Sequence, residues 1–250
     1  MKQSVNLQGI NILPVSMDEA MKRVTAHIPK RQGDYFCFTN IHVIMECHKD
    51  LELKATLNKS TGNFPDGMGV AKALKMLGNR FQDRVRGADF MLKTCEFACR
   101  HNLKVFFYGN TEETLALLSK KLRDLYPDLM IVGAISPPFK DLTEDEDDAY
   151  VRQINASGAD MLFVSLGAPK QEKWMLKHKG RIAAVQLGVG AAFNFLTGQV
   201  KQAPVRMQKT YLEWLYRLPQ EPKKTIYRML LVPEFLCRLC IQMVQERIRQ

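Results

Sequence analysis

The carboxylate with the most informative surroundings is Asp66, in the run Asn63-Phe64-Pro65-Asp66-Gly67-Met68-Gly69. Proline and glycine on either side predict a turn, and a helical pattern begins at Met68. A carboxylate fixed by a turn can act as a general base, because it can be held within hydrogen-bond reach of the proton that it removes. Aspartate is also a good helix N-cap, so the spacing alone leaves both roles open.

Polar and glycine residues also follow several apolar segments that have the pattern of buried strands. These runs are Thr39-Asn40, Tyr108-Gly109-Asn110, Leu166-Gly167-Ala168-Pro169-Lys170-Gln171 and Leu187-Gly188-Val189-Gly190. If the segments are parallel strands of one sheet, their carboxyl ends lie on one rim, where such sheets bind ligands. A nucleotide is the default ligand of that rim, although a fold alone does not establish a function.

Other motifs are incomplete or are better explained as structure. Gly67-Met68-Gly69 and Gly188-Val189-Gly190 do not complete G-x-G-x-x-G, which disfavours hydride transfer with a dinucleotide. The acidic run at 144–148 contains D-x-D, but it begins a predicted helix, where negative charge is favourable, so we expect no metal site. The chain has no G-x-S-x-G elbow, which disfavours a serine hydrolase. It also has no known nucleic-acid-binding motif, so we expect no nucleic-acid partner.

The six cysteines are scattered, and the first residues lack the apolar segment of a signal peptide. We therefore expect reduced thiols in a cytoplasmic protein. Cys237 and Cys240 form a C-x-x-C pair with no second pair at zinc-binding spacing. Because this pair lies in an apolar helical stretch, we expect both side chains to pack in the interior. No apolar segment approaches the roughly 20 residues that span a bilayer.

The chain is basic, with 36 Lys and Arg against 26 Asp and Glu, a net charge of +10 over 250 residues. Residues 201–250 contain ten of the basic and four of the acidic residues, a net charge of +6. A basic tail predicts a phosphate-bearing partner such as an anionic membrane surface or a charged lipid, although many soluble proteins are simply basic.

Apolar runs alternate with helical patterns over the first 198 residues. The predicted strands are 9–15, 35–39, 103–108, 130–134, 161–166 and 183–189. Capping patterns mark helix starts at Ser16 with Glu19, at Thr111, and at Thr143 with Glu146. This alternation predicts βαβ units and an α/β fold with a parallel sheet flanked by helices.

The pattern changes after Gly198. Residues 210–218 are predicted to be helical, and Pro219, Pro222 and Pro233 are expected to divide the rest of the chain into short helices. We therefore divide the chain into a core, 1–198, and a basic helical appendage, 199–250. From Pro233 onward the pattern predicts an amphipathic helix that lies on a membrane. Its expected apolar face is Phe235, Leu236, Leu239, Ile241, Met243 and Val244, and its polar face Arg238, Gln242, Gln245 and Arg249.

Several of these motifs occur together and in this order in one family. The sequence resembles the WecG/TagA/CpsF family of bacterial glycosyltransferases. The resemblance is carried by Thr39-Asn40, Phe64-Pro65-Asp66-Gly67, Arg84-Val85-Arg86-Gly87-Ala88-Asp89, Gly167-Ala168-Pro169-Lys170-Gln171-Glu172, Gly188-Val189-Gly190, and Ala203-Pro204 with Leu212-Glu213-Trp214-Leu215-Tyr216-Arg217-Leu218. It implies an inverting enzyme without a metal or other cofactor, a Rossmann-like core, and a C-terminal helical membrane-targeting appendage.

The same resemblance implies the substrates. Family members transfer a sugar from a UDP-sugar to an undecaprenyl-diphosphate-linked sugar at the inner face of the cytoplasmic membrane. The transferred sugar is of the N-acetylmannosamine or N-acetylmannosaminuronic acid type, or another hexose, and the products serve cell-surface polysaccharides. The resemblance therefore implies a peripheral membrane enzyme with a UDP-sugar donor and a polyprenyl-diphosphate-linked acceptor, and is compatible with a homo-oligomer.

The resemblance also implies site residues. It places Asp66 at the proposed general base, Asn40 at a second catalytic position, and Arg84 and Gln171 at other active-site positions. The amides of Asn40 and Gln171 are expected to hydrogen-bond sugar hydroxyls. The other residues expected to bind substrate are Thr39, Gly109, Asn110, Gly167, Gly188, Gly190, Asn194, Arg217, Lys224 and Arg228. This chain departs from the family pattern at His42 and Asn194, where carboxylates are frequent, and at Lys223-Lys224, where an arginine is usual.

Two other classes of protein stay open. One is a non-catalytic nucleotide-binding protein that docks on membranes through its basic tail. The other is a different UDP-sugar enzyme, such as an epimerase or dehydrogenase, which the missing G-x-G-x-x-G and Tyr-x-x-x-Lys motifs disfavour.

Overall fold

Short apolar segments form the central sheet of the protein. The structure, a computed structural model, describes residues 3–79, 84–204, 206–207 and 212–248. Tyr35–Thr39 (β3) and Met161–Ser165 (β7) are buried at every position, as expected of parallel strands covered on both faces. The six strands lie in the order β4-β3-β8-β7-β5-β6 and all pair in parallel. The other four are β4 (Gly62–Pro65), β8 (Val185–Gly188), β5 (Lys104–Gly109) and β6 (Met130–Ile135).

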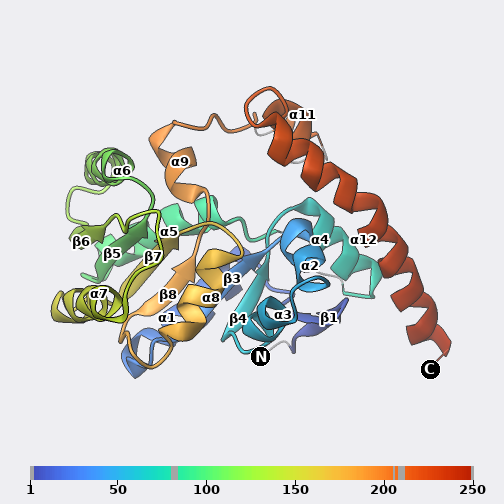
Figure 1. Cartoon of the computed structure of the whole chain (residues 1–250), viewed down its shortest axis with the longest axis horizontal. Helices are drawn as coiled ribbons and strands as arrows, with labels where there is room; N and C mark the ends of the chain where they lie inside the picture. The colour runs from blue at the N-terminus through green and yellow to red at the C-terminus, as the bar shows by residue number, and fades with distance from the viewer. Residues whose placement is uncertain (1–2, 80–83, 205, 208–211, 249–250) are drawn as a thin grey trace.

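Helices cover both faces of this sheet, so the predicted Rossmann-like α/β core is confirmed (Figure 1). One face carries α1 (Met17–Thr25), α5 (Gly87–Arg100), α6 (Glu112–Leu125) and α9 (Ala192–Thr197). The other carries α2 (Ile41–Cys47), α3 (Leu51–Asn58), α4 (Met68–Met76), α7 (Glu144–Ala156) and α8 (Lys170–Lys177). Alternate side chains of β3, β5 and β7 enter two separate apolar clusters, because strand side chains alternate between faces.

The predicted helix starts are confirmed. Ser16 and Thr143 each form a complete capping box with the glutamate three residues later, and Thr111 caps α6. The acidic run at 144–148 therefore lies at the start of α7, where it meets the positive end of the helix dipole. Among the described residues, no group of three or more His, Cys, Asp or Glu side chains could hold a metal ion.

The N-terminal strand prediction is wrong in its extent. Only Ile10–Ile12 (β2) forms a strand, and it pairs antiparallel with Val5–Leu7 (β1) in a sheet of its own. The positive φ angles of Gln8 and Gly9 reverse the chain between the two strands. α3 and β4 were not among the elements predicted from the sequence. Pro65 ends β4 at the edge of the sheet, where the missing N–H of proline breaks no ladder.

The expected short helices of the appendage are wrong as well. A single helix, α12 (Pro222–Ile248), continues through Pro233. Pro222 is the first residue of the helix, where the lack of an N–H is tolerated. An interior proline costs about 3 kcal/mol relative to alanine, and the burial of Leu231, Phe235 and Leu239 offsets this cost. Of the predicted helix 210–218, Glu213–Arg217 (α11) is helical, and residues 210–211 lie outside the described residues.

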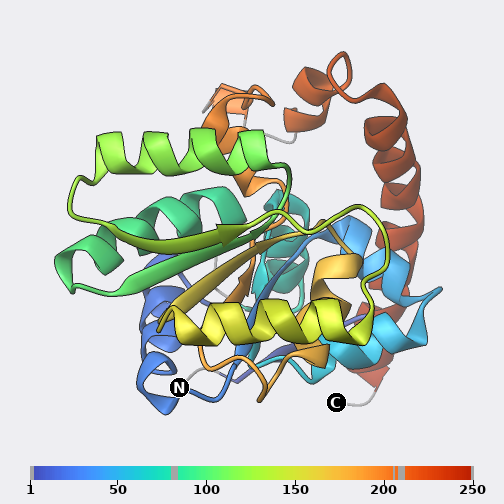
Figure 2. The same cartoon turned by 60° about the vertical axis from the view of Figure 1, so that its left-hand side comes forward.

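α12 runs along one side of the molecule, and Figure 2 shows it standing beside the core. Hydrogen bonds join it to the β1–β2 hairpin: Gln8 N–H donates to Gln242 Oε1 (2.9 Å), and Gln8 Nε2 donates to the Phe235 carbonyl (2.8 Å). The predicted amphipathic faces of this helix therefore need correction. Phe235, Leu239 and Gln242 contact the protein and are not free to face a membrane. Arg249 lies outside the described residues.

The predicted interior packing of the C-x-x-C pair is also wrong, since Cys237 and Cys240 are exposed. Leu231, Phe235 and Leu239 define the inward face of α12 by their spacing of four, which places residues 237 and 240 on other faces. All six cysteines are free thiols. No helix in the described ranges is both long and apolar enough to cross a membrane.

Phe235→Ala should loosen α12, because the ring is 1% exposed and truncating a buried phenylalanine typically costs about 3–5 kcal/mol. Hydrogen exchange should show faster exchange of α12 amides in this variant. Leu236→Ala, next to it but 48% exposed, is the matched control and should leave exchange nearly unchanged. Equal acceleration in both variants would mean that α12 is not held by this contact.

Candidate functional site

The carboxyl ends of β3 and β4 bring the first site residues together. Thr39 pairs in register with Pro65, and the Asp66 N–H donates to the Thr39 carbonyl (2.9 Å). The Val85 N–H donates to the Pro65 carbonyl (2.8 Å). Three segments separated in the sequence, around residues 39, 66 and 85, therefore meet at one end of the sheet.

The chain turns sharply just after Asp66. Gly67 has φ +90° and ψ 150°, a conformation that residues with a Cβ rarely adopt, and it places α4 directly after the aspartate. Asp66 does not cap this helix, since the N-cap position is Gly67 and carries no side-chain hydrogen bond. The capping alternative for Asp66 is therefore wrong, and its carboxylate remains available for chemistry.

The surroundings of Asp66 shift its pKa. Burial raises the pKa of Asp66 to about 6, while the positive charges of Arg86, Arg217 and Arg84 lower it and Glu213 raises it. A carboxylate with a pKa near 6 is a stronger base than an ordinary aspartate and is still ionised at neutral pH.

Arginines from the core and the appendage meet beside Asp66. Arg84 Nη1 lies 3.2 Å from Glu213 Oε2, and Arg217 pairs with the other oxygen of the same carboxylate. The guanidinium groups of Arg217 and Arg86 lie 4.9 and 5.2 Å from the centre of the Phe195 ring, close enough for cation–π attraction. α11 is thereby joined to the core at the predicted active site.

Arg228 and Lys224, on α12, differ in their surroundings. Arg228 precedes Leu231 by three residues and Phe235 by seven, which places it on the side of α12 that faces the core. Its charge interacts with those of Arg217 and Asp66. Lys224 instead forms an ion pair with Glu221 (2.7 Å). The structure thus associates Arg228 with the Asp66 site and leaves the binding role of Lys224 as a prediction.

Gln171 holds a turn at the end of β8. Its Oε1 accepts the Gly190 N–H (3.1 Å), and its Nε2 donates to the Gly188 carbonyl (3.1 Å) and to Glu172 Oε1 (2.8 Å). Ser165 Oγ also donates to the Gly190 carbonyl (2.7 Å). In this structure the Gln171 amide positions the backbone of Gly188 and Gly190, and its contact with a sugar stays a prediction.

The predicted asparagines also have structural partners. Asn40 Oδ1 accepts the Val43 N–H (3.1 Å) and so caps α2. Asn110 Nδ2 donates to Asn194 Oδ1, which links the end of β5 to α9. Gly109, the last residue of β5, and Gly167, two residues after the end of β7, have φ +108° and +78° and lie at the carboxyl ends of these neighbouring strands. The predicted binding residues of the core thus gather at the carboxyl edge, as parallel topology requires.

Comparison with known proteins identifies the family. A model of the glycosyl transferase WecG/TagA/CpsF family matches residues 5–249. The chain belongs to this family. It is therefore a glycosyltransferase, and the resemblance drawn from the motifs is confirmed.

Two relatives carry the same name, N-acetylglucosaminyldiphosphoundecaprenol N-acetyl-beta-D-mannosaminyltransferase. The one from Bacillus spizizenii (strain ATCC 23059 / NRRL B-14472 / W23) is 30% identical over 213 residues, which cover 85% of this chain and 80% of the relative. The one from Bacillus subtilis (strain 168) is 30% identical over 210 residues, which cover 84% and 80%.

Sequence reasoning did not single out four residues that shape the site of this glycosyltransferase. Arg86 and Glu213 lie inside quoted motifs, yet nothing in their spacing shows that they act on Asp66. Phe195 looks like an ordinary core residue until the two arginines are placed against it. Glu172 is buried beside Gln171, and burial raises its pKa to about 7. Its position directly after Gln171 was the available signal.

Glu213→Gln should lower the pKa of Asp66 below about 6, because it removes the negative charge that opposes Arg84, Arg86 and Arg217. Isotope-edited NMR of the aspartate carboxyl carbons measures this titration directly. Glu234→Gln, the same change at the ion pair with Arg238 farther along α12, is the control and should not move it. An unshifted Asp66 titration in the Glu213 variant would show that the two carboxylates are not coupled.

Proposed function

We propose that this glycosyltransferase moves a sugar of the N-acetylmannosamine or N-acetylmannosaminuronic acid type from a UDP-sugar to an undecaprenyl-diphosphate-linked N-acetylglucosamine. The shared name of the two Bacillus relatives supports the acceptor and the mannosamine configuration. The single observation that carries the mechanism is Asp66, a carboxylate with a raised pKa beside several arginines.

The proposed reaction is a direct displacement at the anomeric carbon. Asp66 removes the proton of the acceptor hydroxyl while the oxygen of that hydroxyl bonds to the anomeric carbon. At the same time the bond from this carbon to the UDP oxygen breaks. Attack from the side opposite UDP inverts the configuration of the carbon. A sugar hydroxyl is a poor nucleophile at neutral pH, so the reaction depends on a base held in place before the substrates bind.

The leaving UDP carries increasing negative charge in the transition state, which needs cations or hydrogen-bond donors placed in advance. Arg84 and Arg228 are the proposed cations for UDP, because their charges act on the Asp66 site. In the unliganded arrangement Glu213 pairs with Arg84 and Arg217. A diphosphate can replace that carboxylate, since both are oxygen anions that arginine binds through its planar fork.

We further assign the chemistry to residues 1–198 and completion of the site to the appendage, 199–250. The ion pair between Arg84 of the core and Glu213 of α11 supports this division of labour. The predicted peripheral position at the inner membrane face belongs to the same proposal, because a polyprenyl-linked acceptor is confined to the membrane.

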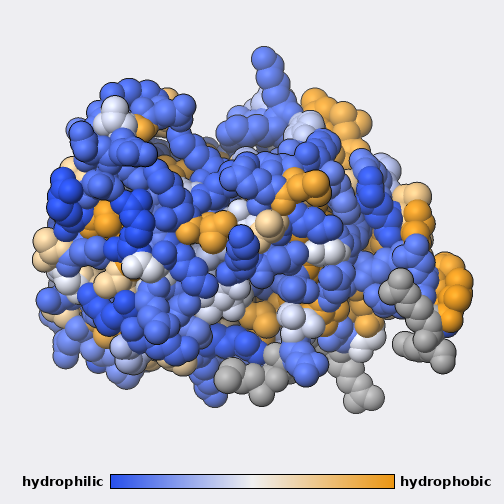
Figure 3. All heavy atoms as spheres, turned by 60° about the horizontal axis from the view of Figure 1, so that its bottom comes forward, coloured by the Kyte–Doolittle hydropathy of each residue, from blue (hydrophilic) through white to orange (hydrophobic). Residues whose placement is uncertain are grey.

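The outer face of α12 supports membrane contact. Ile226, Leu230, Ile241, Val244 and Ile248 are exposed, and their spacing places them on one face, opposite the buried Leu231 and Phe235. Figure 3 shows apolar side chains gathered at the right-hand edge of the molecule, the side along which α12 runs in Figure 1. A helix of this kind lies in the interface with its apolar face among the lipids.

Asp66→Asn should lower turnover roughly 100- to 10,000-fold, because an amide cannot accept the acceptor proton. UDP release from the UDP-sugar donor, in the presence of a short-chain lipid-diphosphate-linked sugar as acceptor, measures the rate. Wild-type activity should fall as the pH drops through about 6, where Asp66 becomes protonated. Asp124→Asn, at an exposed ion pair with Lys120 on α6, is the control and should keep the wild-type rate. An Asp66 variant that keeps more than about a third of the wild-type rate would contradict the general-base role.

Replacing Leu230, Ile241 and Val244 together with Gln should release the protein from vesicles that contain anionic phospholipid. These side chains are exposed, so docking of α12 on the core should persist. Co-sedimentation with vesicles measures the binding. The control replaces Leu51, Leu117 and Leu125, exposed leucines on α3 and α6, with Gln. Equal loss in both triple variants would argue against α12 as the membrane contact.

A further inference from the structure

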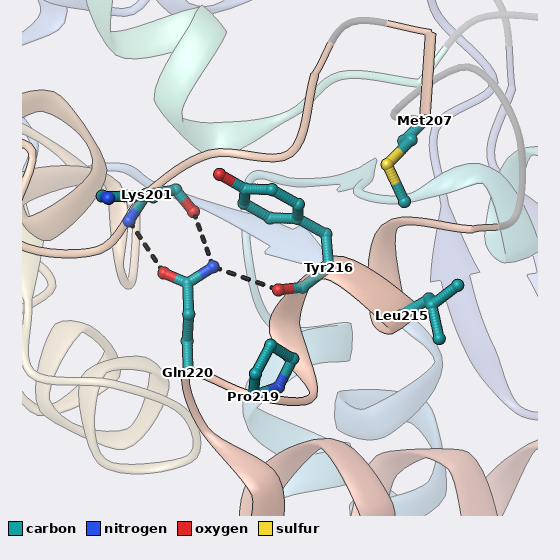
Figure 4. A pocket seen from close by; sticks show the side chains of 6 residues that line it. All are labelled: Lys201, Met207, Leu215, Tyr216, Pro219 and Gln220. Atoms are coloured by element: carbon teal, nitrogen blue, oxygen red, sulfur yellow. Dashed lines mark hydrogen bonds between the residues drawn. The ribbon is translucent and has the colours of Figure 1, made fainter.

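A cavity of about 390 Å³ lies at the junction of the chain after α9 with the region around α11. Six residues line it, as Figure 4 shows: Lys201, Met207, Leu215, Tyr216, Pro219 and Gln220. Its volume is within the range of about 300–1,000 Å³ that is usual for small-molecule sites. Most of its lining is hydrocarbon or aromatic, so its chemistry favours an apolar group.

The Gln220 side chain holds the walls of this cavity together (Figure 4). The Lys201 N–H donates to Gln220 Oε1 (3.0 Å), and Gln220 Nε2 donates to the carbonyls of Lys201 (3.4 Å) and Tyr216 (3.1 Å). The amide thereby ties the chain after α9 to α11. Because the polar atoms of Gln220 already form these hydrogen bonds, they are not needed for a ligand. A ligand in the cavity would instead contact the apolar side chains of Leu215 and Pro219.

The same turn of helix carries a cation of the proposed active site. Tyr216 lines the cavity, and Arg217, the next residue, lies against Phe195 and interacts with Asp66. Successive helical residues point in directions about 100° apart, because the helix has 3.6 residues per turn. α11 therefore presents an apolar wall in one direction and a guanidinium toward the reaction centre in another.

We propose that this cavity binds the first isoprene units of the polyprenyl diphosphate acceptor, with the acceptor diphosphate on the Arg217 side. This rests on the proposed function, which requires such an acceptor. A polyprenyl diphosphate joins an anion directly to a branched hydrocarbon, and the junction of Arg217 with the Leu215–Tyr216 wall matches both parts. Leu215 is 48% exposed, so the cavity is open and the rest of a long chain can leave it.

The test compares binding of farnesyl diphosphate with binding of inorganic diphosphate, by calorimetry in buffer without detergent or vesicles. Leu215→Asn should weaken farnesyl diphosphate binding about tenfold more than inorganic diphosphate binding, the loss expected for one apolar side chain contact. The matched control is Leu236→Asn on α12, because Leu236 has the same 48% exposure as Leu215 and lies outside the cavity. It should change neither affinity.

The outcomes separate this proposal from the proposed function. Equal affinities of the wild type for the two diphosphates, or equal losses in the Leu215 and Leu236 variants, would overturn the cavity as a prenyl site. A parallel assay measures UDP release with N-acetylglucosamine diphosphates carrying a farnesyl or a methyl group. If both acceptors turn over without a preference for the farnesyl compound, the proposed glycosyl transfer stands and the prenyl site is rejected. If the protein binds farnesyl diphosphate selectively but turns over neither acceptor, the prenyl site stands and the proposed glycosyl transfer is rejected.

Discussion

Burial raises the pKa of Asp66, and the positive charges of three arginines lower it. The surrounding structure must therefore bury the carboxylate and also keep these three arginines close to it. Arg84 and Arg86 come from the segment before α5, and Arg217 comes from the appendage. Grouped guanidinium groups repel one another, so Glu213 and the Phe195 ring are needed to hold them at close range. The reactivity of the carboxylate thus depends on how the appendage is seated on the core.

The long helix of the appendage, α12, is held on the core by α2 and the β1–β2 hairpin. α12 packs on α2 and is joined to the β1–β2 hairpin through Gln8 and Gln242, and its buried side chains extend the apolar cluster on one face of the sheet. α2 in turn begins at Asn40, directly after β3. The helix that supports α12 therefore starts at the same sheet edge that carries Asp66, which couples appendage position to site geometry.

The polar residues at the strand ends divide into two groups by what they contact. Gln171, Asn110 and Asn194 form hydrogen bonds within the protein and shape the backbone at the rim. Asp66 and the arginines supply the charge. Asn194 accepts a hydrogen bond from Asn110, a role that the carboxylate frequent in the family could also fill, so the departure at this position preserves the link between β5 and α9.

Local sequence signals determined the parallel core and its helix starts. Buried apolar runs such as Tyr35–Thr39 and capping residues such as Thr143 act through contacts within a few residues, so their pattern is visible in the chain itself. The site motifs and the family could also be found from the sequence. Tertiary structure decided that α12 continues through Pro233, because burial of distant residues offsets the local cost of proline. It also decided that Glu213 and Phe195 belong to the site, since electrostatic and ring contacts depend on distances in space that spacing along the chain does not encode.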